Sequence, residues 1–241
     1  MDSSSADGAS TSWMFDEMAS VGVEYNDPAI VAEYDQHHAT FRDHKAEARV
    51  VMERLGLTPE YCVVDIGCGT GAFTLNFATN CRHIHAVDVS RPMLDRLTEK
   101  AQASGLDNIE IHHAGFLGYQ HADAPADAVF SSFALHHLPD FWKAVALQRI
   151  HEMLKPGGAF YLFDVVFTFP VSDYRAQFDN WIDGMENHAN AVMTEEVATH
   201  IRDEYSTLDW ILEGMMERTG FNIESKHVDA PNCIAYVCVK P

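Results

Sequence analysis

The N-terminal part of the chain has the residue spacing of helices. From residue 13 to 55, apolar side chains recur three and four residues apart, as they do on one face of a helix. Pro28 suits a first helical turn, and Gly56 suits a helix end. We therefore predict helices over residues 13–56 and a disordered tail over residues 1–12.

The next hundred residues alternate short β-rich runs with amphipathic stretches. Because the links between them are short, this alternation indicates right-handed crossovers and a parallel sheet with helices on both faces. The predicted strands span 61–66, 83–89, 109–113, 127–132 and 159–166, and the predicted helices span 71–80, 90–105 and 141–154.

The alternation stops after residue 167. Residues 171–219 have mostly helical spacing, with helix starts predicted at Thr194 and at the run 206–209, which has capping-box spacing. Two short apolar runs close the chain, and the short link between them predicts an antiparallel pair of strands. These two strands span 221–228 and 232–239.

The charge of the chain narrows the class of partner. The 241 residues include 16 Lys and Arg against 36 Asp and Glu, a formal net charge of −20 at pH 7. Nucleic acid and anionic membranes are bound chiefly through Lys and Arg, so neither is an expected partner. Five cysteines without a CxxC pair, no signal peptide and no apolar run of membrane-spanning length indicate a reduced, cytoplasmic protein.

The strongest motif is a glycine loop between a predicted strand and helix, Asp65-Ile-Gly-Cys-Gly-Thr-Gly71. The glycines alone also satisfy the dinucleotide fingerprint, whose helix N-terminus holds a pyrophosphate. Asp65 would then place a carboxylate beside two phosphate charges. S-adenosylmethionine has no phosphate and carries a cationic sulfonium and ammonium, so Asp65 favours it over a dinucleotide.

A second carboxylate ends the neighbouring strand. Asp88 follows Gly71 by 17 residues, and an acidic residue at this point can accept hydrogen bonds from both ribose hydroxyls of a nucleoside. NAD and S-adenosylmethionine share this contact. Asp88 therefore predicts a nucleoside site without choosing between the two.

Four motifs in order resemble one family: Asp65-Ile-Gly-Cys-Gly-Thr-Gly71, Ala86-Val-Asp-Val-Ser90, Phe133-Ala-Leu-His-His-Leu-Pro139 and Leu154-Lys-Pro-Gly-Gly158. Together they resemble the class I S-adenosylmethionine-dependent methyltransferases of the small-molecule type. The resemblance implies a doubly wound, Rossmann-like α/β fold with a seven-stranded, mostly parallel sheet of order 3-2-1-4-5-7-6 and an antiparallel seventh strand. It implies a cofactor-binding domain over residues 57–241 with a helical insert at 171–219, and residues 13–56 form an N-terminal helical lid.

The resemblance also assigns residues to the cofactor. The glycine loop would line the methionine moiety, and Asp88 would bind the ribose. After the third strand the family often has an Asp for the adenine amino group, but here the run is His113-Ala-Gly-Phe116, so recognition of adenine falls to the Gly115 backbone and Phe116. The cofactor contacts implied in this way are Asp65, Gly67, Cys68, Gly69, Asp88, Val89, Met93, Gly115, Phe116 and Ser131.

Two residues are candidates for catalysis at the acceptor. His136 follows the fourth strand, and it either contacts substrate or caps a helix. Asp164 lies near the end of the fifth strand, and it either serves the acceptor or is a hydrogen-bonded structural Asp. No metal ligands are predicted, because His83 and His85 begin their strand, away from its functional end.

Three functions follow from these observations. The leading one is transfer of a methyl group by in-line displacement to a small-molecule acceptor, which leaves S-adenosylhomocysteine. The alternatives are a non-catalytic S-adenosylmethionine-binding module that acts through a protein partner, and an NAD-dependent oxidoreductase.

Five aromatic residues suggest a partly apolar acceptor cavity, and four residues form a face that either closes over the site as a lid or packs on the domain. The aromatic residues are Phe133, Phe167, Phe169, Trp181 and Trp210, and the lid face is Tyr34, His38, Phe41 and Arg42.

Overall fold

The strands of the computed structural model form one sheet. The structure describes residues 13–39, 42–188, 191–230 and 232–241, so the predicted tail lies outside the described residues. The strand order is β3-β2-β1-β4-β5-β8-β7, and β6 pairs with β5 beside this path. The strands are β1 (Cys62–Ile66), β2 (His83–Asp88), β3 (Ile109–His113), β4 (Ala126–Ser132), β5 (Leu154–Phe167), β6 (Thr207–Leu208), β7 (Asn222–Ala230) and β8 (Cys233–Val239).

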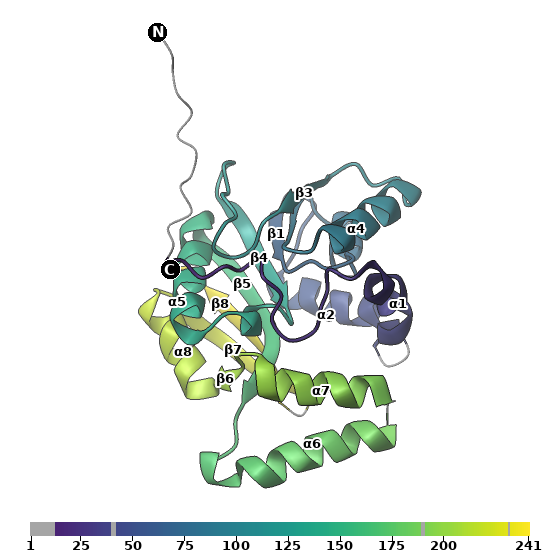
Figure 1. Ribbon diagram of the computed structural model, residues 1–241. Coiled ribbons are helices and arrows are strands. Elements are labelled where there is room, and N and C mark those ends of the chain that lie inside the picture. The colour runs from purple at the N-terminus through teal and green to yellow at the C-terminus, as the bar shows by residue number, and fades with distance from the viewer. Residues whose placement is uncertain (1–12, 40–41, 189–190, 231) are drawn as a thin grey trace.

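Helices cover both faces of the sheet, which gives three layers (Figure 1). Helices α2, α3 and α4 pack on one face, and α5 and α8 pack on the other. Helices α6 and α7 lie side by side beyond the end where β5 finishes (Figure 1). The helices are α1 (Pro28–Ala39), α2 (His44–Leu55), α3 (Thr74–Ala78), α4 (Arg91–Ala103), α5 (Asp140–Met153), α6 (Tyr174–His188), α7 (Ala191–Asp203) and α8 (Asp209–Arg218), with short 3-10 turns η1 (Leu135–His137) and η2 (Val171–Asp173).

The predicted α/β class, doubly wound arrangement and strand order are confirmed. Strands β1 to β5 are parallel where they pair, and β8 runs antiparallel to both β5 and β7. All five residues of β1 are buried, as expected for a strand covered on both faces. The apolar side chains of the two faces form separate clusters, to which α3 contributes Phe77 and α5 contributes Leu147.

The sheet contains one strand more than the seven predicted. Strand β6 pairs with Val166 and Phe167 of β5, whereas β8 reaches only to Val165. Strand β5 therefore extends past its neighbours, and its last backbone groups need another partner. A two-residue strand is too short to leave a hydrophobic pattern in the sequence, which is why it was missed.

The N-terminal prediction is partly wrong. Residues 13–27 form turns rather than a helix, and helix α1 begins only at Pro28. Local polar contacts hold the turns, since the Glu24 carboxylate accepts hydrogen bonds from the Ser20 hydroxyl and from the backbone N–H of Asn26. Gly22 adds a φ of +73°, which a helix does not allow. The stop at Gly56 is confirmed by its left-handed conformation at the end of α2.

Four other boundaries also differ from the prediction. The predicted helix at 71–80 is shorter, as α3, and the strand predicted to begin at residue 159 begins at Leu154, as β5. Thr194 lies inside α7, and the residue before α8 is Leu208, which makes no side-chain cap. The residues at these predicted boundaries have local cap or turn chemistry. The pairing of β5 with β4 and the packing of the helices decide instead where the elements begin.

Candidate functional site

A large cavity lies at the carboxyl ends of the parallel strands. Its volume is about 1330 Å³. Pockets for one drug-sized ligand measure about 300–1,000 Å³, so this cavity has room for two ligands at once. Its wall is built from the loops after β1, β2, β3 and β4, from the N-terminal segment 15–26, and from α6 and α7.

Asp65 presents an oxygen atom without a hydrogen-bond partner to this cavity. Its Oδ2 accepts a hydrogen bond from the Thr74 hydroxyl at 2.5 Å, whereas Oδ1 is buried and has no partner among the described residues. Burial raises the pKa of Asp65 to about 7. A buried acceptor of this kind needs a donor, and an ammonium group in the cavity would supply one.

The glycine loop is shaped by close approach to its neighbours. Gly67 has a φ of +77°, and a Cβ atom there would lie 2.2 Å from the Cβ of Ala134. The backbone N–H of Gly67 donates to the Val87 carbonyl at 2.8 Å, which ties the loop to β2. A residue other than glycine would therefore push the loop away from β4 and into the cavity.

Asp88 ends β2 at the centre of the cavity wall. Its two oxygens accept hydrogen bonds from the backbone N–H groups of Gly69 and Ser90, each at 2.8 Å. Burial raises the pKa of Asp88, and these N–H groups oppose the rise. The carboxylate is thereby held in one orientation, with lone pairs left for a ligand's hydroxyl groups.

The sequence analysis missed Glu17, which fills the space beside Gly115. Its Oε2 accepts a hydrogen bond from the Leu117 N–H at 2.8 Å, and its Oε1 accepts one from the Gly118 N–H at 2.6 Å. A Cβ atom on Gly115 would lie 2.4 Å from Glu17 Oε2, so only glycine leaves this room. A carboxylate therefore does stand near the end of β3, but it comes from the N-terminal segment. No spacing rule links two residues so far apart.

Most of the predicted cofactor contacts line the cavity. Beyond the residues described above, they include Cys68, Val89, Met93 and Phe116. Ser131 does not line it, although its neighbour Ser132 does, and the Ser131 side chain is fully buried in β4. This geometry does not support the predicted contact between Ser131 and the cofactor.

The structure favours one of the two alternatives for Asp164 and places His136 beside the cavity, as its position after the fourth strand suggested. Asp164 is buried behind the wall and does not line the cavity, so it is not placed to touch an acceptor. Its Oδ1 is bonded to His136 Nδ1, and its Oδ2 accepts a hydrogen bond from the His136 backbone N–H at 3.2 Å. His136 does line the cavity, and Asp164 holds its ring in place.

A second carboxylate, Glu204, lies on the other side of the His136 ring. Glu204 Oε2 is 3.2 Å from His136 Nε2, and the same oxygen is paired with His200 Nδ1. Burial lowers the pKa of His136, but the two carboxylates outweigh it and raise the pKa to about 9. His136 is therefore an imidazolium at neutral pH, which makes it a donor and not a base. Neither Glu204 nor His200 was predicted.

The wall opposite the glycine loop is aromatic. Of the five aromatic residues suggested by the sequence, Phe133, Phe169 and Trp181 line the cavity. Phe167 does not, and Trp210 is 66% exposed on α8. Phe133 has a φ of +51°, a conformation that costs a bulky residue about 1–3 kcal/mol and recurs at functional sites.

The N-terminal elements cover the cavity through several contacts. The Ser90 hydroxyl donates to the Tyr25 carbonyl at 2.7 Å, and the Thr70 hydroxyl donates to Asp35 of α1 at 2.5 Å. Of the four residues on the predicted lid face, Tyr34 and Arg42 line the cavity. Phe41 and the side chain of His38 lie outside the described residues. The role of residues 13–56 as a lid remains a prediction.

The charge of the wall decides which ligands suit it. Among the described residues, seven carboxylates line the cavity against two guanidinium groups and the His136 imidazolium. Both guanidinium groups are paired with carboxylates, Arg42 with Glu47 and Arg54 with Asp229. A pyrophosphate would meet repulsion here, whereas a cation would be attracted.

Comparisons with known proteins agree with this geometry. Residues 63–158 match the sequence model of the methyltransferase domain family, and these residues contain the glycine loop, Asp88 and His136. Residues 63–158 therefore form a methyltransferase domain, in agreement with the resemblance to the class I S-adenosylmethionine-dependent methyltransferases. The predicted family and the prediction of a methyltransferase enzyme are thereby confirmed.

Relatives of this methyltransferase are distant. An uncharacterized methyltransferase of Geobacillus kaustophilus is 24% identical, over 78% of this chain and 80% of that protein. A 27-O-demethylrifamycin SV methyltransferase of Amycolatopsis mediterranei is also 24% identical, over 69% of this chain and 64% of its own length. A dimethylglycine N-methyltransferase of Parasynechococcus marenigrum is 37% identical, but over only 46% of this chain and 38% of that protein.

Solved structures share the fold of this methyltransferase. A methyltransferase from Aquifex aeolicus superimposes with a TM-score of 0.63 at 18% identity, covering 89% of this chain and 99% of its own. One from Clostridium acetobutylicum gives a TM-score of 0.65 at 13% identity, covering 88% of this chain and 97% of its own.

Within the described ranges, none of the helices has the length and apolar character that a membrane-crossing segment needs.

Proposed function

We propose that this protein binds S-adenosylmethionine in the cavity and transfers its methyl group to a small molecule. The observation that carries the proposal is the division of the cavity wall. Two buried carboxylates, Asp65 and Asp88, come from the ends of β1 and β2, and the aromatic residues Phe133 and Trp181 come from the β4–η1 connection and α6. A cofactor with cationic groups suits the first side, and a compact, partly apolar acceptor suits the second.

The residues of the first side fit the cofactor in three respects. The unpartnered Oδ1 of Asp65 matches the ammonium of the methionine moiety. The fixed carboxylate of Asp88 matches the two ribose hydroxyls. The Glu17 carboxylate interacts with the backbone N–H groups of Leu117, Gly118 and Gly115, and a carboxylate has about four lone pairs, so it can still accept a hydrogen bond from the adenine amino group.

When bound, S-adenosylmethionine supplies a methyl group on a sulfonium, a leaving group that needs no protonation. The task of the chain is then to bring acceptor and methyl group into line and to exclude water. Phe133 stands at the end of β4 between the two sides, and Arg42 holds its guanidinium 5.1 Å from the Phe133 ring. The two N–H groups of His136 are taken by Asp164 and Glu204, so His136 would act on the acceptor through the fixed position and positive charge of its ring.

The network behind His136 would position the helical insert. Glu204 follows α7 and His200 belongs to it, while Asp164 belongs to β5. Since all three surround the His136 ring, they fix α7 against the sheet at the acceptor side of the cavity. A small molecule is the expected acceptor because α6, α7 and the segment 15–26 border the cavity and limit the space beside the cofactor.

Calorimetry with S-adenosylmethionine and S-adenosylhomocysteine tests the cofactor. We expect one site, and an analogue of S-adenosylhomocysteine with a 6-oxo group in place of the adenine amino group should bind at least about tenfold more weakly. No binding of either natural compound by a folded protein would refute the proposal. Equal binding of the 6-oxo analogue would refute only the contact between Glu17 and the adenine amino group, and not the binding of the cofactor.

Methyl transfer to acceptors is tested separately, with radiolabelled cofactor and a panel of small O-, N-, C- and S-nucleophiles. Labelled small-molecule product is the expected result. A stable cofactor complex that labels no small molecule but labels a protein would refute the small acceptor.

A further inference from the structure

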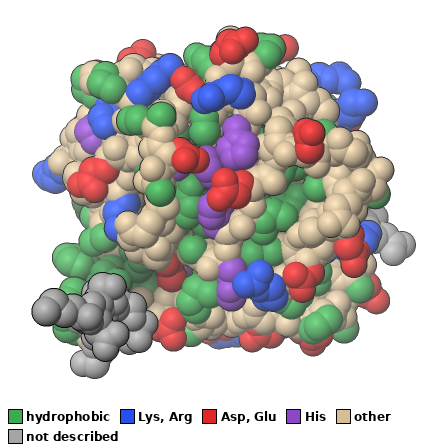
Figure 2. Space-filling model, turned by 90° about the horizontal axis from the view of Figure 1, so that it is seen from above, with side chains coloured by type: hydrophobic (Ala, Val, Ile, Leu, Met, Phe, Trp, Pro, Cys, Tyr) green, Lys and Arg blue, Asp and Glu red, His purple; other side chains and the backbone are tan. Residues whose placement is uncertain are grey.

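A group of histidine and acidic side chains lies far from the cavity, at the amino ends of β2 and β3. Figure 2 views the molecule from above, on the side opposite α6 and α7, and shows histidine side chains beside acidic ones in the middle of this face. The residues that come together are His83 and His85 of β2 with Glu110 and His112 of β3. Nothing in the proposed methyl transfer uses them.

The register of the two strands explains the grouping. Residues two apart on a strand point to the same face, so His83 and His85 share a face. His85 pairs directly with Glu110, which brings Glu110 and His112 to that face as well. The sequence analysis set the histidines aside as strand residues at the wrong end, because it could not know which residues of β3 stand opposite them.

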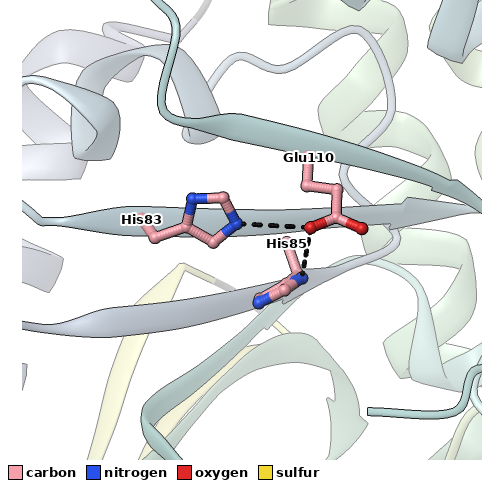
Figure 3. Close-up of side chains that lie close together, drawn as sticks. All are labelled: His83, His85 and Glu110. Atoms are coloured by element: carbon pink, nitrogen blue, oxygen red, sulfur yellow. Dashed lines mark ion pairs between the residues drawn. The ribbon is translucent and has the colours of Figure 1, made fainter. Parts of the chain in front are cut away.

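The distances between the side chains fit a metal ion. His83 Nε2 is 3.5 Å and His85 Nδ1 is 3.7 Å from Glu110 Oε2, as Figure 3 shows. His112 Nε2 is 3.1 Å from His85 Nδ1 and 3.5 Å from Glu110 Oε1. Ligands about 2.0–2.1 Å from one tetrahedral zinc ion lie about 3.3–3.5 Å from each other. The ligand atoms are therefore already near bonding positions.

The surroundings of His85 resemble those of a metal-bound imidazole. Its side chain is 3% exposed, and Nδ1 faces the other ligand atoms. The opposite nitrogen, Nε2, is buried, lies 3.3 Å from Asp123 Oδ2 and makes no hydrogen bond with the described residues. Metal-bound histidines usually donate the second ring N–H to a carboxylate, and Asp123 stands near enough to accept it. Glu110 is 53% exposed, so an ion has a path from solvent.

We propose that His83, His85 and Glu110 bind a divalent cation of the zinc type, with His112 as a further ligand. Imidazole nitrogen with one carboxylate suits Zn²⁺, whereas Mg²⁺ and Ca²⁺ prefer sites made of oxygen atoms. The ion joins edge strand β3 to β2 by side-chain bonds at the ends opposite Asp88 and Gly115. It is a structural site, and it does not depend on the proposed methyl transfer.

A second group of possible ligands, His136, His137 and Glu204, lies in the cavity. There His136 Nδ1 is already bonded to Asp164, and Glu204 is already paired with His136 and His200. These contacts account for the arrangement of His136, His137 and Glu204 without a metal ion. A substitution in this cavity group therefore serves as the matched control for substitutions at the proposed metal site.

The test is competition for Zn²⁺ between a chromophoric chelator and the tag-free, full-length protein after dialysis against a stronger chelator. We expect one bound equivalent, and Glu110→Gln and His83→Gln should each weaken binding at least about tenfold. His137→Gln should bind Zn²⁺ as the wild type does, and Mg²⁺ should not compete. The thermal melts of all variants without metal show that each one is folded.

Two measurements on the wild-type protein keep the proposal testable if a variant does not fold. Co²⁺ should give the visible absorption of a four-coordinate nitrogen and oxygen site, and Zn²⁺ should slow amide hydrogen exchange in β3. Failure of the wild type to bind Zn²⁺ would overturn the proposal. Unchanged affinity in folded Glu110→Gln, or loss of the bound ion in His137→Gln alone, would overturn it equally.

Discussion

Replacing Asp65 with Asn should stabilise the ligand-free protein at alkaline pH while weakening cofactor binding. The Asp65 carboxyl is 1% exposed, and burial raises its pKa from 3.8 to about 7. A raised pKa means that folding disfavours the ionised form. The stability contributed by the protonated group is therefore complete below pH 3.8 and is lost as pH rises through about 7. The side-chain amide of the variant carries no charge at any pH.

The size of the effect follows from these two pKa values. At about 1.36 kcal/mol per pH unit, the raised pKa of Asp65 lowers the free energy of unfolding by about 2 kcal/mol at pH 5.5 and by about 4 kcal/mol at pH 8. The new amide leaves a buried N–H donor without a partner, which costs about 1–3 kcal/mol at either pH. The cost of the amide is the same at both pH values. The free energy of unfolding of the variant relative to the wild type should therefore rise by about 2 kcal/mol from pH 5.5 to pH 8.

Urea unfolding of both proteins at the two pH values, without cofactor, measures this difference. Calorimetry with S-adenosylmethionine should show at least about tenfold weaker binding to Asp65→Asn, because a hydrogen bond between charged groups is lost. If the free energy of unfolding of Asp65→Asn relative to the wild type does not rise between pH 5.5 and pH 8, the high pKa of Asp65 is refuted. Undiminished affinity for the cofactor would refute its contact with the ammonium.

Three further predictions concern the same cavity. Asp88→Ala should lower the affinity for S-adenosylhomocysteine about 100-fold in calorimetry, because two hydroxyl contacts are lost, and unchanged affinity would contradict the ribose assignment. Gly115→Ala should displace the Glu17 carboxylate and weaken binding as much as Glu17→Gln does, and a double variant that loses the sum of both effects would show that they are independent. Glu204→Gln should cost about 3 kcal/mol of unfolding free energy at pH 7. The cost should shrink above pH 9, because the raised pKa of His136 stabilises the fold only while the ring is protonated, and a constant cost in urea unfolding at pH 7 and 10 would contradict this.

Local chemistry made the centre of the fold predictable. Strand β1 reads as an unbroken apolar run because both of its faces are covered, and the glycine loop follows it because only glycine fits there. Ser90 caps α4 through its own side chain, as the sequence suggested, since a cap involves residues only three apart. Asp65 and Asp88 could be assigned for the same reason, because each ends a recognisable strand.

Residues that act across the chain could not be found in this way. Glu17 meets the loop after β3 only because the segment 13–27 crosses the cavity in turns, where the spacing of apolar residues had predicted a helix. Asp164 looked like an acceptor ligand from its place at the end of β5. The fold instead turns its carboxyl behind the wall toward His136, so it holds another side chain.

The sequence by itself determined the α/β class, which depends on periodicity, and its short motifs carried the family resemblance that implied the strand order. The tertiary structure alone decided which distant side chains share a space. It placed Glu204 against His136, and the register of β2 and β3 placed Glu110 between two histidines. The physical reason is that hydrophobic patterns report which face a residue occupies, whereas contacts between elements depend on crossover geometry and strand register, which leave no local pattern.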